Sequence, residues 1–291
     1  MPKIRCSSLP SWPDCPRRTF AKLFPGLVQD AGFELRQLPP SVGAAVGTAV
    51  HKAAERMLVR KRDEGEPGPV ADAVDEAVAT FDEEVATGAE WDDTTPSRRD
   101  AHHQIRRLAS AYAEHVIAAV RPRCVEIPLQ ADAGGGLLLT GHVDLVTEDG
   151  AVPDLKTGAV PRPYQAQLGG YSLLVRSNQE ATGIQKVRWV GTHFIQRVPR
   201  SREQPAPREV AYDVGQAERA ALSTLRDIRE AYGRFRGSGD PWETQANPMS
   251  LMCSARYCPA WGTEFCRMGK ETNTDTREMR NVGNPRAGEA T

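Results

Sequence analysis

The spacing of apolar residues changes along the chain and divides it into helical and extended regions. In the first part, apolar positions such as those within residues 41–62 recur every three or four residues, which predicts amphipathic helices. From residue 124 the apolar runs are short and bounded by turn residues, which predicts strands. The predicted helices are residues 7–24, 41–62, 70–86, 97–120, 163–178 and 215–236, and the predicted strands are residues 124–132, 136–149, 151–158, 186–198 and 208–214.

Capping and turn residues support these boundaries. Ser41 is a suitable N-cap, and Ser97 with Asp100 matches a capping box. The dipeptide Asp149-Gly150 predicts a hairpin between two strands. Residues 25–40 contain several proline and glycine residues, which predicts an irregular connection. The order of helices, a strand meander, a helix, strands and a last helix predicts an α/β or α+β class.

Composition narrows the class of protein. The chain has 291 residues, which suits one large domain or a core with an added subdomain, and 40% of them are hydrophobic. The net charge of -1 gives no global basic field for nucleic acid. Local clusters of basic residues are either solvated faces or a track for phosphates. They are Arg17, Arg18 and Lys22; Arg98, Arg99, Arg106 and Arg107; and Arg197, Arg200 and Arg202.

Other patterns bear on location and cofactors. No apolar run approaches the ~20 residues that a membrane helix needs, and no signal-peptide segment is recognisable, so we expect a cytoplasmic protein without a membrane partner. In that compartment the six cysteines are expected as thiols or metal ligands. Neither a phosphate-binding loop motif nor a dinucleotide-binding glycine pattern occurs, so nothing supports ATP or dinucleotide binding.

One stretch carries a candidate chemistry. In "GHVDLVTEDGAVPDLKTG", residues 141–158, each of two strands contains an aspartate, Asp144 and Asp154, and Lys156 shares a face with the second. Two carboxylates on adjacent strands repel each other unless a cation lies between them. Mg²⁺ accepts one or two carboxylates together with phosphate oxygens. A nearby lysine would offset the charge that develops on a phosphate under attack.

This constellation resembles the PD-(D/E)xK nuclease superfamily, and within it the RecB-like branch, which includes the nuclease domains of RecB and AddB and the CRISPR-associated RecB-like exonucleases. The matching segments lie in the order of that branch between residues 7 and 266. They are "SSLPSWPDCPRR" (7–18), "GTAVHKAAE" (47–55), "GHVD" (141–144), "DLKTG" (154–158) and "QLGGY" (167–171). The resemblance implies an α/β, restriction-endonuclease-like fold with a central mixed sheet flanked by helices, a helical N-terminal part and a Cys-rich C-terminal segment.

The resemblance also implies site residues. A Mg²⁺ or Mn²⁺ ion would be bound by His51, Asp144, Asp154 and the carbonyl of Leu155. Lys156 would be the catalytic lysine, beside the two aspartates. Gln167 and Tyr171 are neighbours on one helix face and would contact the DNA backbone or orient the lysine.

The cysteines resemble the iron–sulfur staple of AddB-type and CRISPR-associated members. One early cysteine and three late ones would hold a 4Fe-4S cluster: Cys15, Cys253, Cys258 and Cys266. The gaps between the late cysteines are wider than in the family, so a zinc ion bound by the four cysteines is the alternative to the cluster. Cys6 is an alternative to Cys15 as the early ligand, and Cys124 is expected to be a packing residue.

The expected organisation is a single RecB-like nuclease domain over residues 1–269, followed by a disordered tail at 270–291. Within it, residues 25–120 would form a helical subdomain, 124–214 the nuclease core and 247–269 the Cys-rich staple.

The expected function is a metal-dependent exonuclease that hydrolyses single-stranded or end-containing DNA. The alternatives are a structure- or site-specific endonuclease of the same superfamily and a non-catalytic DNA-binding or assembly protein. A second copy of the chain, a separate helicase, a recombination protein or a CRISPR adaptation protein are the protein partners left open. The origin could be a phage, a CRISPR system or recombination repair.

Overall fold

The computed structural model describes residues 1–267, and the tail predicted at 270–291 lies outside that range. The chain divides into two compact units, which are described separately. The first unit comprises Met1–Pro10 and Pro39–Leu225, and the second comprises Ser11–Leu38 together with the described residues from 226 to 267. None of the helices in the described range is long and apolar enough to cross a membrane.

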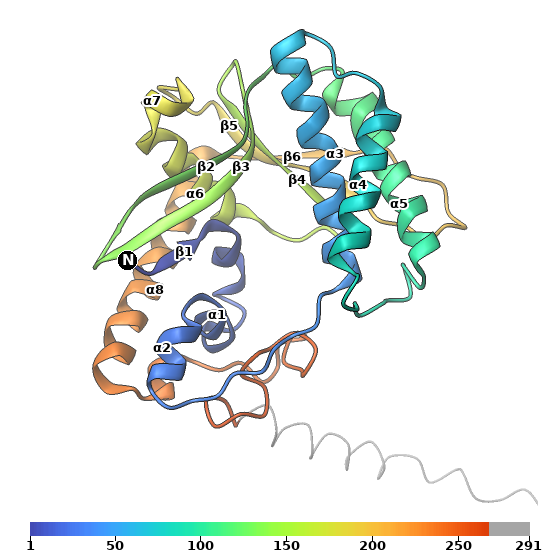
Figure 1. The fold of residues 1–291 in the computed structure, drawn as a ribbon. Helices are drawn as coiled ribbons and strands as arrows, with labels where there is room; N and C mark the ends of the chain where they lie inside the picture. The colour runs from blue at the N-terminus through green and yellow to red at the C-terminus, as the bar shows by residue number, and fades with distance from the viewer. Residues whose placement is uncertain (268–291) are drawn as a thin grey trace, which may run out of the picture. The chain divides into compact units, whose positions relative to one another are not determined.

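The first sheet is mixed and has the strand order β1-β3-β2 (Figure 1). β2 (Pro122–Gly134) and β3 (Leu137–Thr147) form an antiparallel pair, and β1 (Lys3–Arg5), which the pattern did not predict, joins β3 in parallel. Gly134, Gly135 and Gly136 all have positive φ at the connection between β2 and β3, a conformation that favours glycine.

The second sheet is also mixed and has the order β4-β5-β6. β4 (Ala151–Gly158) pairs in parallel with β5 (Trp189–Gln196), which pairs antiparallel with β6 (Arg208–Tyr212). The predicted hairpin is therefore wrong, because β3 and β4 do not pair with each other and belong to different sheets. The turn forms, with Gly150 at φ +81, but β4 continues into the other sheet because its ladder partner is β5.

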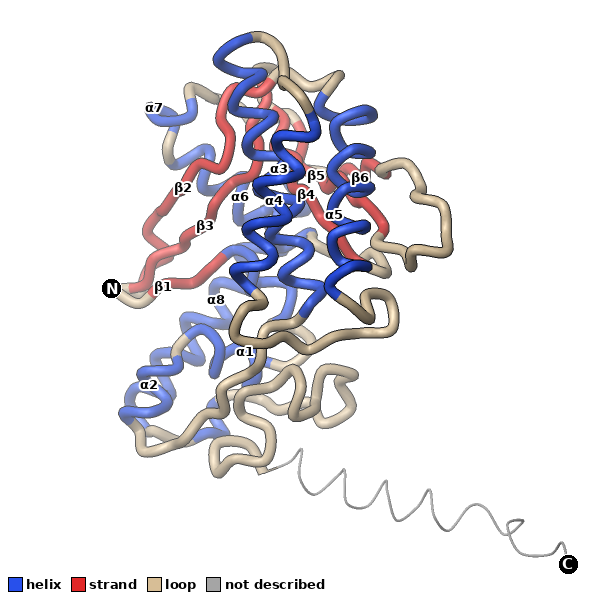
Figure 2. The backbone as a smooth tube through the Cα atoms, turned by 45° about the vertical axis from the view of Figure 1, so that its right-hand side comes forward, coloured by secondary structure: helices blue, strands red, loops and turns tan. Residues whose placement is uncertain are grey.

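Three helices pack together in the first unit (Figure 2). They are α3 (Val42–Glu64), α4 (Val70–Glu84) and α5 (Arg98–Tyr112), which match the predicted segments, except that α5 passes into a π-helical turn at Ala113–Ile117. Their apolar stripes share one core with buried side chains from the strands, namely Val125, Leu145, Leu155 and Ile195. Burial of these stripes, rather than helix propensity alone, stabilises helices of this length.

Another helix of the first unit lies between strands in sequence. α6 (Gln165–Ser177) packs against strands of both sheets, and a short α7 (Gln179–Thr182) follows it. Gly141 of β3 lets α6 approach the strand closely, because a Cβ at this position would lie 2.7 Å from the ring of Tyr171 on α6. The predicted α/β class, with mixed sheets flanked by helices, is confirmed; the strands are arranged as two three-stranded sheets.

The second unit brings together distant parts of the sequence. It contains α1 (Pro16–Leu23), α2 (Pro25–Asp30), the end of α8 (Val214–Ser238) and a 3-10 turn at Pro241–Glu243. The helix α2 interrupts the region predicted as irregular. An aromatic cluster forms the core, with ring centroids 4.8–5.8 Å apart, and consists of Phe20, Phe24, Phe33, Tyr232, Phe235 and Phe265.

Candidate active site

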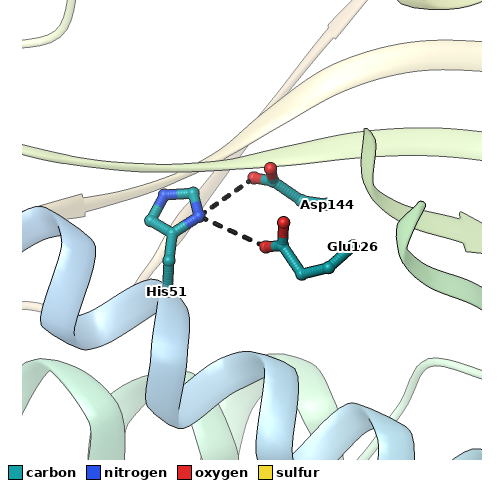
Figure 3. A group of neighbouring side chains, drawn as sticks. All are labelled: His51, Glu126 and Asp144. Atoms are coloured by element: carbon teal, nitrogen blue, oxygen red, sulfur yellow. Dashed lines mark ion pairs between the residues drawn. The ribbon is translucent and has the colours of Figure 1, made fainter. Parts of the chain in front are cut away.

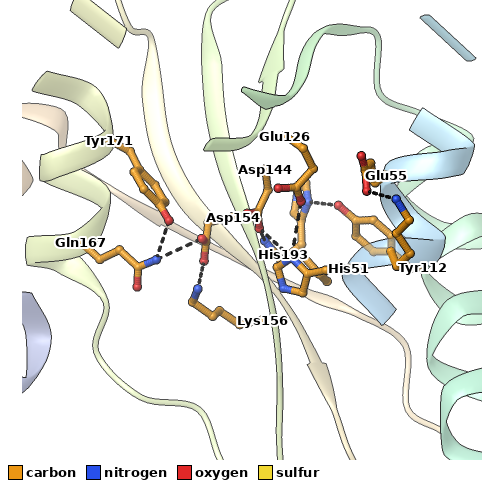
Figure 4. Close-up of polar contacts among 12 residues, drawn as sticks. His51, Glu55, Tyr112, Glu126, Asp144, Asp154, Lys156, Gln167, Tyr171 and His193 are labelled. Atoms are coloured by element: carbon orange, nitrogen blue, oxygen red, sulfur yellow. Dashed lines mark hydrogen bonds and ion pairs between the residues drawn. The ribbon is translucent and has the colours of Figure 1, made fainter. Parts of the chain in front are cut away.

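Polar side chains from the helices α3 and α6 and from the strands β3 and β4 converge in the first unit (Figure 4). They line a hollow of about 930 Å³ that also receives basic residues from the first strand, Lys3 and Arg5. The sequence-predicted residues that line it are His51, Asp144, Asp154, Lys156, Gln167 and Tyr171. The fold therefore gathers residues that are up to 120 positions apart in the chain.

Asp154 and Lys156 form a close ion pair on β4. The ammonium lies 2.6 Å from Oδ2 of Asp154, whose side chain is 1% exposed. Burial alone would lower the pKa of Lys156, but the charges of Asp154 and Asp144 raise it, so the lysine stays a cation. Its ammonium also lies 5.1 Å from the ring centre of Tyr164.

Gln167 and Tyr171 hold the other side of Asp154. The amide of Gln167 donates to Oδ1 of Asp154 at 3.2 Å and to the hydroxyl of Tyr171 at 3.0 Å, and all three side chains are buried. Burial raises the pKa of Tyr171 well above its usual range, so its hydroxyl remains protonated. The predicted pair on one face of α6 thus lies directly against the carboxylate.

His51, Glu126 and Asp144 form a compact group (Figure 3). Nδ1 of His51 lies 3.4 Å from Oδ2 of Asp144 and 3.7 Å from Oε1 of Glu126. Burial disfavours a charged His51, but the neighbouring carboxylates outweigh it and raise its pKa to about 9. A protonated histidine therefore occupies the position of a cation between the two acids.

The pKa of Asp144 is raised to about 7, because its carboxyl group is desolvated and faces the charges of Asp154 and Glu126, while His51 and Lys156 act in the opposite direction. The backbone N–H of Leu155 donates to Oδ2 of Asp144 at 2.8 Å. Leu155 thus places its backbone beside this carboxylate, while its side chain is buried in the core.

Sequence reasoning missed Glu126. The pairs Val125–Leu145 and Ile127–Val143 place it opposite Asp144 on the neighbouring strand, where like charges are destabilising. Among the described residues it is also the one non-glycine residue with positive φ, at +47, a conformation that costs about 1–2 kcal/mol. An acid between two apolar strand residues was the available signal. In this structure the repulsion between the two carboxylates is offset by His51, which lies beside both.

The donor set fits a hard divalent cation. Oδ2 of Asp154 is buried and, apart from its ion pair, has no aligned hydrogen bond. Carboxylate oxygens suit Mg²⁺ or Mn²⁺, and the imidazole nitrogen adds a softer donor that several divalent metals accept. The group within 4.8 Å comprises His51, Glu126 and Asp144, whereas Asp154 is oriented by Lys156 and Gln167.

Four cysteines line a second pocket, which lies within the second unit: Cys15, Cys253, Cys258 and Cys266. All are free thiols. Burial, with smaller effects from the neighbouring thiols, raises the pKa of Cys258 to about 11. Cys6 is not among them, because it lines the acidic hollow of the first unit. Cys124 is half-buried, and its thiol lies 3.8 Å from the carbonyl of Thr182.

The residue types fit more than one metal group. Four cysteine thiolates can hold either a zinc ion or a 4Fe-4S cluster.

The comparison with protein families decides the assignment. The model of the PD-(D/E)XK nuclease superfamily matches residues 6–266, which is most of the chain and includes the acidic residues, Lys156 and the four cysteines of the second unit. The chain belongs to the PD-(D/E)XK nuclease superfamily. The predicted superfamily is confirmed, and it is a superfamily of hydrolases that act on nucleic acid.

Solved structures agree on the fold. The chain is similar to a "Putative exonuclease" from Eubacterium rectale, with a TM-score of 0.53, 11% identity and 86% of each chain covered. A structure of LHK-Exo in complex with dAMP covers 66% of this chain and 96% of that one, at 11% identity and a TM-score of 0.28, which is too low to carry an argument. No curated protein matches the chain.

Proposed function

We propose that this member of the superfamily is a Mg²⁺- or Mn²⁺-dependent deoxyribonuclease of the RecB-like branch, and that it acts as an exonuclease on single strands or DNA ends. The observation that carries the proposal is the convergence of Asp144, Asp154 and Lys156 in one hollow with His51. Degenerate, non-catalytic members would be expected to lack one of the acids or the lysine.

The site residues divide the chemical work. His51, Asp144 and Glu126 would hold the cation, and the carbonyl of Leu155 and the carboxylate of Asp154 would complete the set. When bound, the cation supplies Lewis-acid polarisation of the scissile phosphate.

The other side chains act on the same phosphate. The ammonium of Lys156 offsets negative charge that develops on the phosphate oxygens. Gln167 and Tyr171 fix the orientation of Asp154 and thereby of the lysine paired with it.

Two observations favour an exonuclease over a site-specific endonuclease. A structure that is similar over 86% of this chain is named a "Putative exonuclease". In the described range, the chain forms a nuclease core and a small Cys-lined unit, with no recognisable target-recognition module. We infer that it works in the cytoplasm, alone or beside a separate motor protein.

The test is digestion of end-labelled linear DNA, single- and double-stranded, and of closed circles, with Mg²⁺, Mn²⁺ or EDTA. The proposal expects loss of linear substrate from one end with a metal present, and intact circles. Cleaved circles would assign an endonuclease. Absence of any cleavage with either metal would overturn the enzymatic assignment.

We further propose that the four cysteines hold an iron–sulfur cluster, of the 4Fe-4S type, rather than zinc. The support is that all four cysteines, one early and three late in the sequence, line one pocket. Such a cluster would join the N-terminal segment of the second unit to its C-terminal one. Protein purified without oxygen should be brown, absorb near 400 nm and contain iron. A colourless preparation containing one equivalent of zinc would contradict this.

A further inference from the structure

Two arginine clusters that are separate in the sequence form one basic pocket in the first unit. The hollow is lined by Arg98, Arg99, His102, His103, Arg106 and Arg200. Every lining residue is basic, which is a distribution unlike that of the chain as a whole, whose acids and bases nearly balance.

Part of this charge is neutralised and part is not. Asp82 contacts His102 at 2.9 Å and Arg98 at 3.5 Å. Arg99 and Arg200 are exposed, and neither forms an ion pair with another residue of the described range. The pKa of His103 is lowered by burial and by the charges of Arg107 and Arg200, which is consistent with a net positive field.

The loop that carries Arg200 is fastened to α5. The amide of Gln104 donates to the carbonyl of Val198 at 3.1 Å, and the guanidinium of Arg107 donates to the carbonyl of Arg202 at 2.5 Å. These bonds hold Arg200 opposite the first turns of α5. The convergence of cations is therefore built by the fold and is not a chance feature of flexible side chains.

The pocket lies within reach of the acidic site. Lys156 on β4 is in register with Phe194 on β5, and Arg200 follows Phe194 by six residues. Six residues span at most about 21 Å, and neighbouring strands lie about 5 Å apart, so the two sites are within roughly 25 Å. A strand of duplex DNA covers that distance in about seven nucleotides at ~3.4 Å each.

We propose that this basic pocket binds backbone phosphates of the DNA strand, several nucleotides from the bond that is cut. The proposal rests on the proposed nuclease function for the identity of the nucleic acid. A phosphodiester chain fits because its charges are regularly spaced and it can reach both sites, whereas a single small anion would use only one.

The test is binding of labelled single-stranded DNA in EDTA, so that no cleavage occurs, to wild-type protein and to the double variant Arg99→Ala/Arg200→Ala. The variant should bind an oligonucleotide of about 16 residues at least about fivefold more weakly. Its plot of log affinity against log salt should be flatter by about 1.4, since each lost phosphate contact on a single strand accounts for about 0.7. An oligonucleotide of about four residues should show a smaller difference between the two proteins, because it cannot contact the pocket and the acidic site together.

The control is Arg60→Ala/Arg219→Ala, which removes the same charge from exposed positions outside the pocket. Circular dichroism of each variant checks the fold. Equal affinities and equal salt slopes for the wild type and the pocket variant would overturn the inference. The proposed nuclease function would still stand in that case if the wild type cleaves DNA. Wild-type protein that neither binds nor cleaves DNA would remove both. Mononucleotide or inorganic phosphate competing as well as the long oligonucleotide would also overturn it.

Discussion

At the scale of single residues, each acid of the candidate site has a different set of neighbours. Asp154 is held by Lys156 and Gln167, whereas Asp144 faces His51, the N–H of Leu155 and Glu126. In the proposed function, the first arrangement would position the Lys156 ammonium against the substrate, and the second concentrates negative charge that a metal would relieve. Substitution of one member of each set should therefore give different phenotypes.

Asp154→Asn and Lys156→Ala should each reduce the cleavage rate at least about 100-fold, because they remove charge stabilisation at the scissile phosphate. Circular dichroism should remain unchanged. Rates are measured on end-labelled linear DNA with Mn²⁺ in excess. Asp93→Asn and Lys186→Ala, which alter exposed residues outside the hollow, serve as matched controls. Wild-type rates in either site variant would show that the assigned site is wrong.

Glu126→Gln keeps the shape of the side chain and removes its charge. Affinity for Mn²⁺, measured by calorimetry without DNA, should fall about 10- to 100-fold if the carboxylate helps to hold the ion. The pKa of His51, followed by NMR, should fall as well, since Glu126 is one of the groups that raise it. A residue with a purely structural role would lower the melting temperature and leave both measurements unchanged.

At the scale of elements, close approach between backbones fixes the helix that carries Gln167 and Tyr171. A Cβ at Gly169 of α6 would lie 1.9 Å from the carbonyl oxygen of Ala217 at the start of α8. Glycine at this position is required by packing, not by φ. The motif "QLGGY" thus combines two site residues with a contact that holds their helix in place.

Gly169→Ala should lower the free energy of unfolding by about 1–3 kcal/mol, because α6 or α8 must shift to admit the methyl group. Gly233→Ala, in the interior of α8, is the control, since nothing lies within 4 Å of a Cβ there. It should instead stabilise the protein by up to about 1 kcal/mol through helix propensity. Urea titration followed by circular dichroism measures both. Equal free energies of unfolding for the two variants would show that the contact between Gly169 and Ala217 does not determine stability.

At the scale of the whole molecule, the acidic hollow couples stability to pH and to metal. Both Asp144, with a pKa of about 7, and His51, with a pKa of about 9, are raised above their ordinary values of 3.8 and 6.5. The folded state therefore binds more protons than the unfolded one between about pH 4 and pH 9. In that window the stability of the metal-free protein must decrease as pH rises.

Metal-free protein should accordingly melt at a lower temperature at pH 9 than at pH 6, other groups being equal. Added Mn²⁺ should raise the melting temperature more at pH 9, because the ion competes with protons for the same groups. Scanning calorimetry with EDTA or Mn²⁺ at each pH measures both effects. The variant Glu126→Gln should show a smaller pH dependence. A metal effect that is independent of pH would place the ion elsewhere.

The sequence by itself determined the kinds of element and most of their order, because helix and strand periods are local and each is written in a short window. It also predicted that Asp144, Asp154 and Lys156 lie close together, since they belong to two consecutive strand segments that are joined by a short turn. The pair Gln167 and Tyr171 was predictable for the same reason, because one helix face holds both.

Only the tertiary structure decided which strands pair and which distant residues meet. The pairing of β4 with β5 rather than β3 depends on a ladder between segments more than thirty residues apart. Membership of Glu126 in the acidic group depends on the register of β2 against β3. The joining of Arg200 to the cations of α5 depends on hydrogen bonds from Gln104 and Arg107. Such contacts leave no period in the sequence, because they are selected by packing of the whole core.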